Sequence, residues 1–95
     1  MEEKTKGLRV SRLFVLNGEG TVKAMCDVAV GNLFVIKGLR VIKGKQGIFV
    51  SMPRQQGKDG KWYDSVHPLT KEARAEVGRV VLEAYHREAA VEETI

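Results

Sequence analysis

The chain has 95 residues, the length of one domain with a small hydrophobic core. Its residues are 43% hydrophobic and 29% charged, with two prolines, a composition typical of folded globular proteins and not of disordered chains. The net charge is +4 at pH 7. We expect a single domain over residues 1–95, with its core at about 7–87 and frayed ends at 1–6 and 88–95.

Several classes of protein are excluded by simple counts. Uninterrupted apolar runs such as Leu13–Leu16 reach four residues, whereas a membrane-spanning helix needs about 20. Residues 1–6 contain no apolar segment of the kind that a secretory signal requires. A single cysteine, Cys26, cannot form an internal disulfide, and two histidines are too few for a usual structural zinc site. We expect a cytoplasmic protein with no membrane insertion, metal or cofactor.

Positive charge is concentrated in the first two thirds of the chain. Residues 4–61 hold 12 Lys and Arg against three acids, a balance of +9, whereas residues 62–95 hold four against seven, a balance of −3. A basic surface of this kind attracts either nucleic-acid phosphates or the acidic surface of a protein partner.

The first half of the chain has the patterns of β-strands. Apolar residues recur at every second position of 22–30, the period of a half-buried strand. The preceding segment, 8–16, changes the phase of its alternation, which predicts a bulge near Ser11 and Arg12. Residues 17–20, Asn-Gly-Glu-Gly, predict a hairpin loop between these two strands.

Two more strands are predicted at 33–43 and 48–52. The first carries apolar side chains on both faces, which favours a central strand or a subunit interface. Gly38 inside it indicates a bulge or a close backbone approach. The glycine-rich turn at 44–47 joins the two strands, so short connections link all four into an antiparallel meander.

The second half predicts one helix. Residues 54–61 are polar and contain two glycines, which indicates an exposed, mobile loop, and 62–64 adds a short strand. Thr70 is the expected N-cap of an amphipathic helix of about four turns over 73–85. We expect close packing against the sheet to explain Gly78 within it. The predicted fold is α+β, a meander of four to five strands followed by a C-terminal amphipathic helix.

Candidate catalytic residues give a weak signal. Asp64 and His67 with Ser51 or Ser65 could nominally form a catalytic set, but no nucleophile-elbow pattern accompanies them. An Asp or His beside a turn more often bonds nearby backbone. Cys26 lies on the apolar side of its strand, so we expect a buried side chain and not a reactive thiolate. The sequence favours a protein that is not an enzyme.

The strongest functional signal is a set of basic residues at two connections. Two flank the hairpin tip that the glycine-rich turn forms and three lie in the polar loop: Lys43, Lys45, Arg54, Lys58 and Lys61. If both connections project from one region of the sheet, these cations cluster, with Trp62 and Tyr63 nearby as platforms for base stacking. The alternative is that the cations only solvate loops while both aromatic side chains close the core.

Several blocks of the sequence also occur in a characteristic order and spacing. They are Ala24, Leu33–Ile36, Leu39–Ile42, Gly44, Gly47–Val50, Met52-Pro53, Asp59-Gly60, Asp64, His67-Pro68, Val81-Leu82 and Tyr85–Arg87. In these blocks, and over about residues 7–87, the chain resembles the stage V sporulation protein G (septation regulator) family. The contiguous pattern Gly-Ile-Phe-Val-x-Met-Pro is the most specific of them.

The resemblance implies an α+β domain, a homodimer formed through strands, and a bacterial regulator linked to septation and sporulation that binds DNA and RNA. Family members commonly carry adjacent basic residues where this chain has Gln55 and Gln56. We therefore expect a non-catalytic homodimer that holds DNA or RNA phosphates through the five basic residues, with Arg74 and Arg79 as weaker contacts. The alternative is a protein-interaction module of the division machinery that uses the sheet edge or the acidic helix.

Overall fold

The computed structural model describes residues 7–93, with side chains through Ala89. The fraying expected at 1–6 lies outside the described residues, as do residues 94 and 95. The elements are β1 (Leu8–Val15), β2 (Val22–Val30), β3 (Phe34–Gly44), β4 (Gly47–Ser51), β5 (Arg54–Gln56), β6 (Trp62–Asp64) and α1 (Lys71–Glu93). The predicted α+β class and the predicted order of strands before helix are confirmed.

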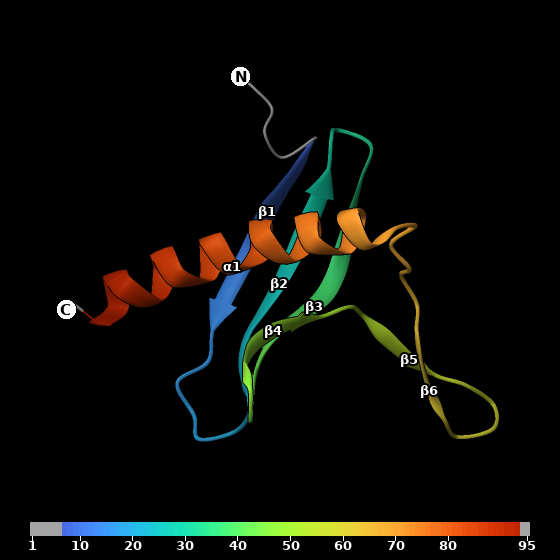
Figure 1. The fold of residues 1–95 in the computed structure, drawn as a ribbon, viewed down its shortest axis with the longest axis horizontal. Helices are drawn as coiled ribbons and strands as arrows, with labels where there is room; N and C mark the ends of the chain where they lie inside the picture. Colours follow the sequence, from blue (N-terminus) through green and yellow to red (C-terminus); the bar gives the residue numbers. More distant parts are fainter. Residues whose placement is uncertain (1–6, 94–95) are drawn as a thin grey trace.

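The first four strands form an antiparallel sheet in the order β1-β2-β3-β4, and α1 crosses one face of it (Figure 1). We call this covered side the inner face and the opposite side the open face. Alternate residues of β2 and β3 pack under the helix because side chains in a strand point to opposite faces in turn. The buried core consists of Ala24, Cys26, Val28, Leu39, Val41, Met52 and Val81.

Two bulges explain why the apolar alternation changes phase along the strands. In β1 the register passes from Val10 opposite Val28 to Arg12 opposite Asp27, which leaves Ser11 unpaired as predicted. In β3 the bulge lies at Gly38, which has a φ of +90° and donates its N–H to the Asp27 carboxylate at 3.3 Å. The Gly38 bulge restores the inner-face alternation, so a strand with apolar residues on both faces still packs correctly.

The helix begins as predicted and ends later than expected. The Thr70 hydroxyl accepts a hydrogen bond from the Ala73 N–H at 2.9 Å, which is the N-cap interaction. The helix then continues to Glu93, past the predicted four turns and through residues that we expected to fray. Among the described residues, no helix is long and apolar enough to cross a membrane.

The expected reason for Gly78 is wrong. A Cβ added at this glycine would meet nothing within 4 Å, so the sheet does not approach the helix closely there. Val81, one turn further on, is fully buried and makes the contact with the core instead. Close packing therefore does not require a glycine at position 78.

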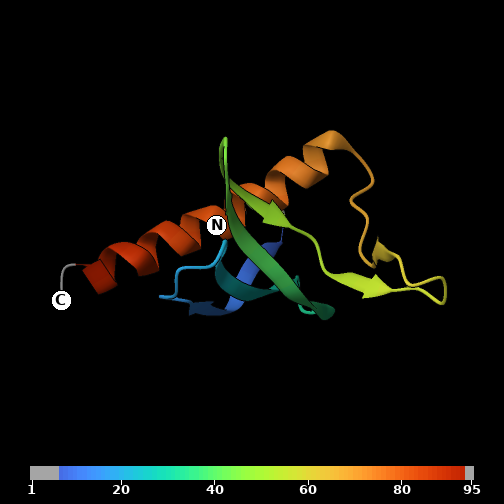
Figure 2. The same ribbon diagram turned by 90° about the horizontal axis from the view of Figure 1, so that it is seen from below.

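The polar segment expected as an irregular loop is instead half of a second, two-stranded sheet. β5 pairs with β6 in antiparallel register, with Gln55 opposite Tyr63, and the hairpin projects away from the main sheet (Figure 2). The Gly57 N–H donates to the Lys61 carbonyl at 2.8 Å and closes the turn. The prediction of a strand at 62–64 is confirmed. Its partner strand was missed because three exposed polar residues show no apolar alternation.

Candidate nucleic-acid interface

The open face of the sheet mixes arginines with exposed apolar side chains. The strand register places Phe14, Met25 and Arg40 side by side across three strands. The Arg12 guanidinium lies 5.1 Å from the centroid of the Phe14 ring, a cation–π contact on the same face. No described element packs on this face in the way that α1 packs on the inner one. It is therefore available to a ligand or to another protein surface.

The first basic connection is the tip of the β3–β4 hairpin. Gly44 pairs with Gly47, so Lys45 and Gln46 form the turn. The Lys43 N–H donates to the Thr21 carbonyl at 2.8 Å, which fixes this tip beside the β1–β2 loop. Lys23, a residue that the sequence analysis did not single out, joins Lys43 and Lys45 around one shallow pocket with Glu19 on its rim.

The second basic connection is the β5–β6 hairpin, where the three predicted cations have different surroundings. Lys58 and Lys61 are exposed at its tip. The Arg54 guanidinium instead donates to the Trp62 carbonyl at 3.2 Å and lies 3.3 Å from the Asp64 carboxylate. Arg54 therefore stabilises the hairpin, whereas the exposed side chains of Lys58 and Lys61 are accessible to a ligand.

The five predicted cations do not form one cluster. Figures 1 and 2 both show the β3–β4 tip and the β5–β6 tip well apart from each other. The condition for a single cluster, that both connections project from the same region, is not met. Instead the structure has two separate basic tips. The open face of the sheet, with its own arginines, lies between them.

The two neighbouring aromatic residues of β6 also differ in their surroundings, because successive residues of a strand point to opposite sides. The Tyr63 hydroxyl donates to the Asp59 carboxylate, and its ring lies over Gly57, where an added Cβ would come within 2.9 Å. This hydrogen bond lowers the pKa of Asp59 and raises that of Tyr63. Trp62 is 55% exposed on the other side. The alternative that both aromatic residues close the core is not what the structure shows.

Three of the four nominal catalytic residues, Ser51, Ser65 and Asp64, are engaged in structural contacts, and His67 is exposed. The hydroxyls of Ser51 and Ser65 donate to the backbone carbonyls of Met52 and Pro53, at 3.3 and 3.2 Å. Asp64 faces Arg54 and, at 3.9 Å, Arg74. Within the described residues, no three His, Cys, Asp or Glu side chains gather as metal ligands would.

The single cysteine is buried, as the strand pattern predicted. Cys26 is 2% exposed in the core between sheet and helix. Burial, with a smaller contribution from the neighbouring Asp27, raises the pKa of the Cys26 thiol to about 11. The thiolate is therefore scarce at neutral pH, and the side chain packs as a small apolar group.

The helix presents a different kind of surface. The Arg79 guanidinium bonds the carboxylates of Glu76 and Glu83 at 2.7 and 3.0 Å, and Arg74 lies near Asp64. The two arginines expected as weaker phosphate contacts thus already have acidic neighbours on or beside the helix. Exposed ion pairs of this kind contribute little to stability, but they reduce the charge available to a phosphate.

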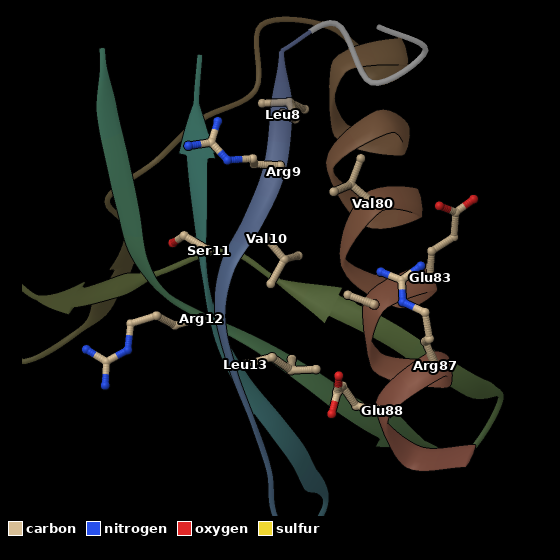
Figure 3. A pocket seen from close by; sticks show the side chains of 11 residues that line it. Leu8, Arg9, Val10, Ser11, Arg12, Leu13, Val80, Glu83, Arg87 and Glu88 are labelled. Atoms are coloured by element: carbon tan, nitrogen blue, oxygen red, sulfur yellow. The ribbon is translucent and has the colours of Figure 1, made fainter. Parts of the chain in front are cut away.

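A groove runs between β1 and α1, with a volume of about 480 Å³. Figure 3 shows Val10 and Leu13 pointing from β1 toward the helix, with Glu83 and Glu88 on the helix side. β1 is an edge strand of the sheet, so one side of its backbone is open. The apolar floor and the mixed charges of this groove differ from the basic open face.

The fold and this surface together define a small α+β protein with one face covered by a helix and the other open and basic. The sequence model of the SpoVG family matches residues 8–87, almost the whole described chain. The chain belongs to this family.

Several proteins that carry the name "Putative septation protein SpoVG" are similar to the chain over most of its length. One from Archaeoglobus fulgidus is 43% identical over 77 residues, covering 81% of this chain and 91% of the relative. One from Geobacillus thermodenitrificans is 37% identical over 84 residues, or 88% of each. One from Bdellovibrio bacteriovorus is 40% identical over 77 residues, or 81% of this chain and 70% of the relative.

Proposed function

We propose that the protein is a non-catalytic, cytoplasmic, homodimeric regulator linked to septation, and that it binds DNA or RNA through the basic tips and open face of its sheet. The observation that carries this proposal is the separation of charge between the strands with their loops and the helix. Residues 7–70 hold ten Lys and Arg against four acids, whereas α1 holds four against six. Phosphates are attracted to the first surface and repelled from the second.

A dimer is supported by exposed apolar side chains at the β2–β3 end of the sheet. Leu33 is 81% exposed, Phe34 61% and Val35 41%, and these residues are consecutive. Large apolar side chains left exposed at one end of a sheet commonly mark a protein interface. The names of the similar septation proteins support the link to septation.

The direct test is to remove charge from one tip at a time and to measure nucleic-acid affinity across 50–200 mM salt. The hairpin variant is Lys58→Ala with Lys61→Ala, since these two cations are exposed. The second variant is Lys43→Ala with Lys45→Ala. Each phosphate contact contributes roughly 0.7 to 0.9 to the slope of log K against log salt. We expect each double variant to flatten the slope by about 1.5.

The matched control removes the same charge from the helix, by Lys71→Ala with Arg87→Ala. Both residues are exposed on α1, so the net charge changes equally while the proposed interface is intact. We expect this control to keep the wild-type slope. If the control flattens the slope as much as the tip variants do, binding follows net charge alone and the proposed interface is wrong.

A second candidate function is the docking of a protein partner from the division machinery. It is favoured by the groove between β1 and α1 and by the open edge of β1. Just past the end of β1, the Leu16 N–H donates to the Lys23 carbonyl of β2 at 2.9 Å. In an antiparallel ladder the peptide groups of Leu13 and Val15 then face the open edge, where an extended partner segment can add a strand. A saturable protein partner that is lost on Leu13→Pro, with nucleic-acid binding unchanged, would establish this function.

A further inference from the structure

A pocket of about 620 Å³ lies between the open face of the sheet and the base of the β5–β6 hairpin. Its sheet side includes Met25, Lys37 and Arg40, and its hairpin side includes Arg54 and Trp62. The volume is in the range of pockets that hold small organic ligands. The pocket exists because the hairpin projects from the sheet at an angle, so the sequence analysis did not predict it.

The charge of this pocket is of one sign. Its lining includes three cations and, among the described residues that form it, no acid. Arg54 is already paired with Asp64, but within the described chain neither Lys37 nor Arg40 has an ion-pair partner. By contrast, Glu19 of the β1–β2 loop lines the pocket at the β3–β4 tip, and Glu83 and Glu88 line the groove beside β1. Lys37 and Arg40 therefore offer charge that no ion pair neutralises, while the nearby Asp27 carboxylate is held by the Gly38 N–H at 3.3 Å.

The aromatic wall of the pocket is Trp62. Its indole is about half exposed, whereas its neighbour Tyr63 is tied to Asp59 on the other side of the hairpin. The backbone of Trp62 is fixed by its antiparallel pairing with Gln56 and by the hydrogen bond that the Arg54 guanidinium donates to the Trp62 carbonyl. An exposed indole on a fixed backbone, beside free cations, is the combination that proteins use to bind unpaired bases.

We infer that this pocket binds an unpaired nucleotide of single-stranded DNA or RNA, with the base stacked on Trp62 and the adjoining phosphates held by Lys37 and Arg40. The inference rests on the proposed function and makes it specific: the open face prefers single strands to duplexes. The bases of a duplex remain stacked on one another. Its phosphates can therefore contact Lys37 and Arg40, but its bases cannot stack on the Trp62 indole.

The chain has one tryptophan, so its intrinsic fluorescence reports on this site alone. The wild-type protein is titrated with single-stranded oligomers of deoxyribose and of ribose, a duplex, and an abasic oligomer with the same number of phosphates. We expect fluorescence quenching by both base-bearing single strands, at about tenfold higher affinity than for the abasic oligomer. The comparison of the two sugars shows which nucleic acid the site prefers.

Three variants separate stacking from charge. Trp62→Leu, followed with labelled oligomers, is expected to weaken single-strand binding about tenfold and to leave duplex binding unchanged, while Trp62→Phe retains most of the affinity. Lys37→Ala with Arg40→Ala is expected to flatten the single-strand salt slope by about 1.4. The control is Leu69→Ala, which removes a fully exposed apolar side chain between β6 and α1, outside the pocket and the two basic tips, and should bind as wild type.

Each other outcome overturns the inference in a recognisable way. Nucleic-acid binding that is unaffected by Trp62→Leu and does not quench the fluorescence leaves the proposed function intact and removes this site. A blue shift that grows with protein concentration and without any oligomer places Trp62 in the interface between two copies. If the wild-type protein binds no oligomer, the proposed function and the inference both fail.

Discussion

The main sheet with its helix and the β5–β6 hairpin are held together by different forces. The sheet and helix share a core in which Leu39, Val41 and Val81 are fully buried. The hairpin contributes exposed residues and is maintained by turn hydrogen bonds and by the Arg54–Asp64 ion pair. Stability thus resides in the core between sheet and helix, whereas the proposed binding surface consists of exposed residues of the hairpin and of the open face, outside that core. A substitution should therefore affect one and spare the other.

The largest expected effect is on the core. Leu39→Ala removes a fully buried side chain between β3 and α1, so the free energy of unfolding should fall by about 2–5 kcal/mol. Lys58→Ala with Lys61→Ala should change it by less than about 0.5 kcal/mol, because both side chains are exposed. Urea unfolding of both variants measures this contrast. Equal destabilisation by the two would contradict the separation of roles.

A smaller loss is expected at the start of the helix. Thr70→Ala removes the hydroxyl that accepts the Ala73 N–H, which should lower the free energy of unfolding by about 1 kcal/mol. Thr70→Ser keeps this acceptor and serves as the control in the same unfolding experiment. An alanine variant as stable as wild type would mean that the cap contributes nothing to folding.

The smallest expected effect has the opposite sign. Gly78→Ala adds a methyl group where nothing lies within 4 Å, in the middle of a helix. Alanine should raise the free energy of unfolding by about 0.5–1 kcal/mol, because glycine loses more backbone entropy in a helix. Thermal unfolding checks the sign. A destabilised variant would show that the helix does need a glycine here to pack.

The contrast between the buried core and the exposed hairpin also determines which elements could be predicted from the sequence. The four strands, the bulges at Ser11 and Gly38, and the Thr70 cap each leave a local pattern, so all were predicted. β5 was not, since its three residues are polar and exposed, and its pairing depends on β6 and the turn. Apolar periodicity reports burial, and a hairpin without a buried face has none.

The candidate site was predicted only in its parts. The sequence identified the basic residues and Trp62, but their grouping depends on the angle at which the hairpin leaves the sheet. Lys37 and Arg40 were not singled out, because in sequence they are ordinary polar positions of a strand. Only the register and the fold place them opposite Trp62.

The central claim is that the sheet side of the fold binds nucleic acid, and its most direct test is the salt dependence of binding by the wild-type protein. Affinity for single-stranded and duplex oligomers is measured from about 50 to 200 mM salt, with the oligomeric state determined in the same samples. The account predicts a dimer with a steep negative slope of log K against log salt, and tighter binding of the single strand. A flat slope, or dissociation constants weaker than about 10⁻⁴ M at physiological salt, would contradict it.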